Sequence, residues 1–229
     1  MISQSQDTAL VIVAKGALLH GWKDYAEYCL AREKGLRQEA FTCLDKFMAQ
    51  VGTWTFDECI TFIKFLFPHF ENIPDADYGP FPQPVKEFVK PFLIKWCDVE
   101  THDSTPFRWY GRYYWDKDYY RKAIEINPQD HLARKWLIEW LDGWLYERLD
   151  FLPTNCYDEP EIELPVVAEA KAHIMCISNE LEREKYLKEI EQSEQLIINF
   201  RDWKASGHSN FEQWGIDNNK PTSYSNFKD

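Results

Sequence analysis

Glycine is scarce in this sequence, with nine residues among 229. The glycine-rich motifs GxGxxG, GxxxxGK(S/T) and GxSxG are all missing. Their absence excludes the usual nucleotide-binding loops and the nucleophile elbow of hydrolases. We therefore predict no catalytic residue and no cofactor.

Paired cysteines and long apolar runs are also missing. The six cysteines stand singly, no CxxC occurs, and a chain of this size does not need disulfides. We expect reduced thiols and a cytoplasmic location. The stretch from Met1 to Gly16 has no basic segment, and its apolar part is too short for a secretory signal or a membrane span.

Basic residues are outnumbered, with 26 Lys and Arg against 38 Asp and Glu, giving a formal charge of −12. An acidic chain is repelled by phosphate backbones and anionic lipid. We therefore expect neither nucleic acid nor membrane as a partner. The charge suits a basic protein surface, or solubility alone.

Aromatic residues are abundant, at 16% with ten tryptophans, and so many rings require a substantial core. The clearest helix covers residues 132–149, where apolar residues keep a three-four spacing for five turns. Asp130 is placed as its N-cap, and Pro153 ends the run. We expect the residues of its apolar face to be largely buried, among them Trp136, Trp140, Leu141 and Trp144.

The rest of the chain also predicts helices. Residues 8–20 are expected to be helical because no second β-rich segment could pair with a strand there. Thr55 and Glu58 have the spacing of a capping box. Pro165 fits the first turn of a helical stretch that bends near Ser178-Asn179. We predict an all-α fold, an irregular stack of eight or nine helices in antiparallel hairpins. It forms a single domain over residues 1–215, with a loose tail over 216–229.

The junction around Pro128 carries a motif of its own. Tyr120 is followed three residues later by Ala123, then by Pro128 at the start of the next helix and by the small residue Ala133. This pattern resembles one tetratricopeptide (TPR) unit, although Gly111 lies too close to Pro128 for a full-length first helix. The resemblance implies TPR-like stacking of helical hairpins and no chemistry.

Candidate metal and catalytic groups are few. His173 and Cys176 lie one helical turn apart, but two ligands do not make a site. Residues 75–79 have the look of a calcium loop with its glycine at the wrong position, which favours a plain turn. The adjacent residues 102–104 cannot converge as a triad. We predict no metal.

Two stretches are candidates for binding a partner. The first contains Arg108, Trp109, Tyr110 and Arg112. In one interpretation its rings are core and its arginines pair with acids; in the other it is a protein-binding surface, because Trp, Tyr and Arg dominate interface hot spots. The second is an acidic loop between prolines, which we expect to steer a basic partner. Its acids are Asp158, Glu159, Glu161 and Glu163.

These observations favour a binding module over an enzyme. A small, acidic, helical chain rich in Trp and Tyr is similar in type to bacterial immunity proteins. That similarity implies a non-catalytic protein that binds and occludes a toxin domain, often a basic one. One alternative is a TPR-like adaptor or chaperone that binds peptides. A third is an enzyme on a helical scaffold, which would need acids such as Asp75, Asp77 or Glu58 to converge in a cleft.

Overall fold

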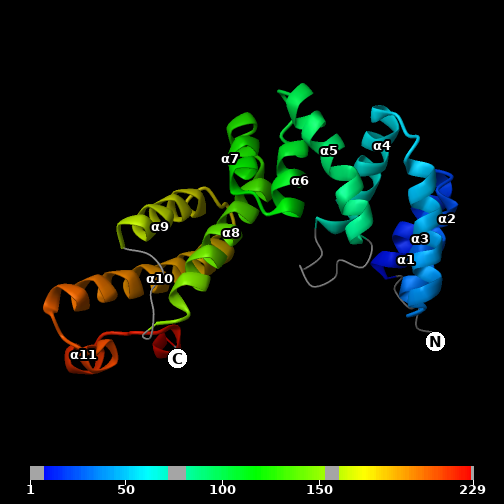
Figure 1. Ribbon diagram of the computed structural model, residues 1–229. Coiled ribbons are helices and arrows are strands. Elements are labelled where there is room, and N and C mark those ends of the chain that lie inside the picture. Colours follow the sequence, from blue (N-terminus) through cyan, green and yellow to red (C-terminus); the bar gives the residue numbers. More distant parts are fainter. Residues whose placement is uncertain (1–7, 72–80, 153–159, 228–229) are drawn as a thin grey trace, which may run out of the picture. The chain divides into compact units, whose positions relative to one another are not determined.

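The computed structural model describes residues 8–71, 81–152 and 160–227, and within these ranges it contains eleven α-helices, two short 3-10 helices and no strand (Figure 1). The prediction of an all-α fold is confirmed. No helix in the described ranges has an apolar stretch long enough to cross a bilayer.

The chain divides into two compact units, Met1–Thr101 (unit 1) and His102–Asp229 (unit 2). The sequence analysis expected a single domain over residues 1–215. The boundary gives no compositional signal, because residues 100–104 contain neither proline nor glycine.

Unit 1 consists of helices that pack mainly on their neighbours in sequence. The pairs α1–α2, α2–α3 and α4–α5 make most of its contacts. The predicted capping box is present, since the Thr55 amide donates to Glu58 Oε2 over 2.7 Å and Thr55 Oγ1 accepts from the Glu58 amide. An aromatic cluster including Tyr25, Phe47 and Phe62 fills the interior. The elements are α1 (Ala9–Leu19), α2 (Lys23–Glu33), α3 (Arg37–Val51), α4 (Phe56–Leu66), the 3-10 helix η1 (Phe67–Phe70) and α5 (Gln83–Val99).

Unit 2 begins with α6 (Thr105–Tyr114), α7 (Lys117–Ile126) and α8 (His131–Leu149), and α7 packs on both of its neighbours. Tyr120, Ala123 and Ala133 are buried at these contacts. The Tyr120 ring lies directly against Gly111, where a Cβ would be 2.7 Å from the ring. The absence of a side chain at Gly111 therefore sets how closely α6 approaches α7.

The second half of unit 2 contains α9 (Pro160–Ile174), α10 (Glu180–Ser206), α11 (Phe211–Asn218) and the 3-10 helix η2 (Tyr224–Phe227). Helix α10 packs on α8 and α9 and has α11 at its far end (Figure 1). Its N-cap is Asn179, whose Oδ1 accepts from the Glu182 amide over 3.1 Å. The predicted break near Ser178-Asn179 is therefore confirmed.

Three sequence expectations for unit 2 need correction. Helix α9 begins at Pro160 and includes Pro165, so the predicted loop is helical from residue 160. The tail from residue 216 is packed through residue 227: Asn199 Nδ2 donates to the Pro221 carbonyl, and the Tyr224 hydroxyl lies 2.9 Å from Ser193 Oγ.

On α8, Trp136 and Leu141 are buried as expected, but Trp140 and Trp144 are only partly buried.

The five described cysteines are free thiols, and their reduced state in the native protein stays a prediction. Cys156 lies outside the described residues. Burial raises the pKa of Cys29 and Cys97 to about 12, which keeps these thiols protonated and unreactive near neutral pH.

Candidate functional site: a hollow at the start of α8 and α10

Two capped helix starts frame the site. Asp130 is the buried N-cap of α8: its Oδ1 accepts from the Ala133 amide over 3.0 Å. Its Oδ2 accepts from Ser104 Oγ over 2.7 Å and from Arg108 Nη1 over 2.8 Å. Together with the Asn179 cap of α10, these bonds fix where the two helices begin.

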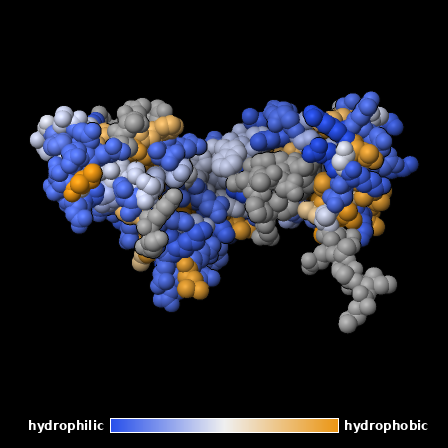
Figure 2. Space-filling model, turned by 90° about the horizontal axis from the view of Figure 1, so that it is seen from below, coloured by the Kyte–Doolittle hydropathy of each residue, from blue (hydrophilic) through white to orange (hydrophobic). Residues whose placement is uncertain are grey.

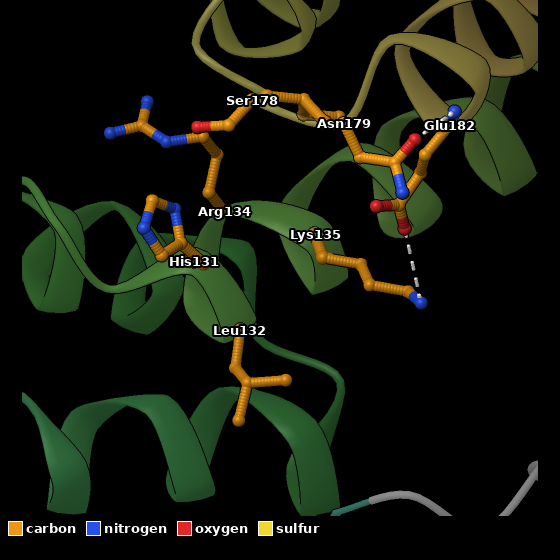
Figure 3. A pocket seen from close by; sticks show the side chains of 8 residues that line it. His131, Leu132, Arg134, Lys135, Ser178, Asn179 and Glu182 are labelled. Atoms are coloured by element: carbon orange, nitrogen blue, oxygen red, sulfur yellow. Dashed lines mark hydrogen bonds and ion pairs between the residues drawn. The ribbon is translucent and has the colours of Figure 1, made fainter.

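Between the first turns of α8 and α10 lies an open hollow of about 320 Å³ (Figure 3). This volume is at the small end of the range for ligand pockets. Figure 3 shows the Lys135 side chain extending toward Glu182. The lining residues are His131, Leu132, Arg134 and Lys135 of α8, the connecting residues Ile177, Ser178 and Asn179, and Glu182 of α10.

Arg134 supplies a fixed positive charge to the wall. It is buried, and its Nη2 donates to the Pro128 carbonyl over 2.6 Å, while its Nη1 lies 3.2 Å from His173 Nδ1. A guanidinium only donates, so Nδ1 accepts and His173 carries its proton on Nε2. Burial, and then the charge of Arg134, lowers the pKa of His173. His173 is therefore neutral near neutral pH.

Lys135 and Glu182 face each other across the hollow. Lys135 Nζ lies 3.3 Å from Glu182 Oε1, and the two side chains are 43% and 35% exposed. An exposed ion pair of this kind contributes little stability, commonly below about 1 kcal/mol. An ammonium has three donors, so Lys135 can serve a second acceptor while it keeps this contact.

Two exposed apolar side chains lie close in sequence to the residues that line the hollow. Met175 and Leu181, two residues before and two residues after the lining run 177–179, are 64% and 79% exposed. Elsewhere, the face drawn in Figure 2 shows hydrophobic residues in small groups within a mainly hydrophilic surface. Together with the hollow, these two side chains are the candidates for contact with a partner.

The side chains of the first predicted binding stretch are largely buried in the interior of unit 2. Trp109 and Tyr110 are buried. Arg108 pairs with Asp130, and Arg112 lies 3.9 Å from Glu139 and over the Trp136 ring. This is the first of the two interpretations given above. The alternative, a partner surface formed by these four side chains, does not fit their burial.

Of the four acids in the second predicted binding stretch, only Glu163 has a described side chain. Asp158 and Glu159 lie outside the described residues, and Glu161 belongs to α9 with a side chain that is not described. Glu163 is 1% exposed, because α9 turns this position toward the interior of unit 2. Glu163 is therefore removed from the predicted rim, while steering by the other three acids stays a prediction.

The candidates for catalysis and metal binding are not brought together in the described ranges. Asp75 and Asp77 lie outside them, and Glu58 is committed to the cap of α4, where bonds from Thr55 lower its pKa. His173 contacts Arg134, and Cys176 lies 3.5 Å from the Ala172 carbonyl. No group of three or more His, Cys, Asp or Glu among the described residues could hold a metal ion.

The sequence analysis missed the lining residues of the hollow. Asp130 and the break at Ser178-Asn179 were both recognised as points where helices begin. Nothing in the sequence indicates that these two points are neighbours in space, because residues 135 and 177 are separated by more than a whole helix. The sequence therefore indicates where each helix begins, but it does not indicate that the two helix starts lie side by side.

Comparison with protein families, curated proteins and solved structures finds no match to this chain. The resemblance to a TPR unit and the similarity in type to immunity proteins therefore stay predictions.

Asp142 of α8 has a partly buried carboxyl, and the charged groups that act on it belong to α10. Burial, and then the charge of Glu189, raises its pKa to about 6, while Lys185 acts in the opposite direction. The folded protein thus binds this proton more tightly than the unfolded chain does. Stability from Asp142 falls as pH rises from about 4 to about 6, and stays lower above that window.

Asp142→Asn is therefore expected to increase the free energy of unfolding at pH 7.5 by on the order of 1 kcal/mol, a value discounted for solvent screening. The gain should vanish near pH 4. Urea unfolding at the two pH values measures this, with Glu147→Gln, an exposed acid on the same helix, as the control. An Asn variant no more stable than the wild type at pH 7.5 would contradict the assignment.

Proposed function

We propose that this protein is a non-catalytic protein-binding module that contacts its partner at the end of unit 2 where α9 meets α10. The observation that carries the proposal is the hollow together with two exposed apolar side chains close to its lining residues in sequence, Met175 and Leu181. A central pocket with apolar residues around it is the arrangement in which interface hot spots are found.

The charge of unit 2 supports a particular kind of partner. Unit 2 contains 24 Asp and Glu against 16 Lys and Arg, a formal charge of −8. Such a surface attracts a basic protein and raises its rate of association. Within the proposal, the protein acts as an immunity protein that occludes a basic toxin domain.

Site-specific photo-crosslinking tests the proposal. A benzoylphenylalanine placed at Leu181 is expected to capture one major protein from an extract of the native host. The matched control is the same group at Val99, an apolar residue at the end of α5 in unit 1 that is 62% exposed. Equal capture at both positions, or none at Leu181, would reject this surface.

A further inference from the structure

Positive charge gathers at the hollow although unit 2 is acidic. Two of its eight lining residues, Arg134 and Lys135, are cationic, and only Glu182 is acidic. Arg183 brings a further guanidinium to the connecting loop, where its Nη1 donates to the Ile177 carbonyl over 3.0 Å, but its Nη2 lies 3.9 Å from Glu180 Oε1. The lining itself therefore has an excess of one positive charge, a cationic spot on an acidic unit.

The backbone adds to this charge. Helix N-termini carry a partial positive charge from amides that have no partner within the helix, and two of them, those of α8 and α10, meet at the hollow. One acid lies beneath α8, namely the N-cap Asp130. Its charge is met by Arg108, and Ser104 donates to the same oxygen. Asp130 therefore does not cancel the positive end of α8, which has no acid in its first turn, whereas Glu180 and Glu182 in the first turn of α10 offset the positive end of that helix.

The remaining lining is apolar. Leu132 and Ile177 lie beside the charged groups, and the stems of Arg134 and Lys135 extend this surface. A volume of about 320 Å³ is too small for a large cofactor and suits one or two residues of a protein segment. The hollow thus offers an apolar contact and a cationic contact side by side.

The geometry points to a specific occupant: a carboxylate next to a large apolar side chain, presented by a segment of the protein partner. This inference rests on the proposed function and names what the site recognises. The apolar side chain contacts Leu132 and Ile177, and the carboxylate pairs with Lys135. A single acidic group seated in a cationic spot would fix the register of a partner whose remaining surface is basic.

Short peptides test the chemistry directly. One probe is an acetylated triglycine-leucine peptide with a free carboxylate, and a second is an amidated peptide that contains Asp-Leu. Their neutral counterparts carry a leucine amide and Asn-Leu. Amide chemical shifts of the nitrogen-15-labelled protein report binding. We expect a carboxylate peptide to shift residues 131–135 and 177–182 and to bind at least tenfold more tightly than its neutral counterpart.

The two carboxylate peptides distinguish a chain terminus from an acidic side chain, and preferential binding of either one supports the inference. Equal binding of neutral and carboxylate peptides would overturn it. Absence of shifts with all four peptides would overturn it as well.

A matched pair of lysine variants locates the carboxylate. Lys135→Met should remove the preference for the carboxylate peptide. Lys122→Met is the control, because Lys122 is also a surface lysine of unit 2, 48% exposed and paired with Glu125 at 3.0 Å. An unchanged preference in the Lys135 variant would overturn the inference. If a partner is crosslinked at Leu181 but the hollow does not prefer carboxylate peptides, the inference fails and the proposed function stands. If the hollow prefers carboxylate peptides but no partner is crosslinked at Leu181, the proposed function fails.

Discussion

Asp130→Ala is expected to lower the free energy of unfolding by about 3–5 kcal/mol, the usual cost of removing one member of a buried ion pair. Asp130 caps α8 through the Ala133 amide, accepts from Ser104 Oγ and pairs with Arg108, and its side chain is almost fully buried. The substitution removes all three contacts at once. Urea-induced unfolding followed by tryptophan fluorescence measures the loss.

A second N-cap aspartate in the same unit provides the control. Asp116 caps α7 by accepting from the Asp118 amide over 3.0 Å, but it is more exposed. Asp116→Ala should therefore cost only about 1 kcal/mol, the ordinary value for a lost N-cap. If the two variants were destabilised equally, the buried network around Asp130 would not have the role assigned to it.

Gly111→Ala is expected to destabilise unit 2 by about 1–3 kcal/mol, the usual cost of overpacking a well-packed core. The new methyl group would lie 2.7–3.0 Å from three carbons of the Tyr120 ring, and Tyr120 is buried. The ring cannot move aside without disturbing the contact between α6 and α7. The midpoint of urea unfolding reports the change.

Gly143 provides the opposite case. It is an exposed glycine within α8, and a Cβ there would meet nothing within 4 Å. Gly143→Ala should stabilise the protein by about 0.5–1 kcal/mol, because alanine has the higher helix propensity. The two glycines are therefore expected to change stability with opposite signs. A stabilising Gly111→Ala would show that α6 and α7 do not approach each other this closely.

Much of the fold could be predicted from local signals. Asp130 and Thr55 are recognisable as caps because a helix start needs a side-chain acceptor for its amides. The stretch at Ser178-Asn179 was predicted only as a bend, and the structure shows that Asn179 is the N-cap of α10. The spacing of apolar residues likewise identified α8. Local signals were ambiguous at Pro160 and Pro165, since either proline suits a first turn, and choosing the later one placed Glu163 in a loop.

The site could not be predicted in the same way. Periodicity shows which face of a helix is buried, but it does not show which helix ends meet. The hollow joins residues 131–135 to residues 177–182, and this pairing depends on how α8, α9 and α10 pack. Trp140 illustrates the same limit: it belongs to the apolar face of α8, yet it remains partly exposed because its neighbours do not cover it fully.

The affinity of the crosslinked partner for a double variant, Met175→Ser with Leu181→Ser, tests the central claim most directly. Both side chains are exposed, so the melting temperature should change little, while the dissociation constant should rise at least tenfold. Val99→Ser, at an apolar position of unit 1 that is 62% exposed, should bind like the wild type. A double variant that binds its partner with wild-type affinity would contradict the assignment of this surface as the binding site.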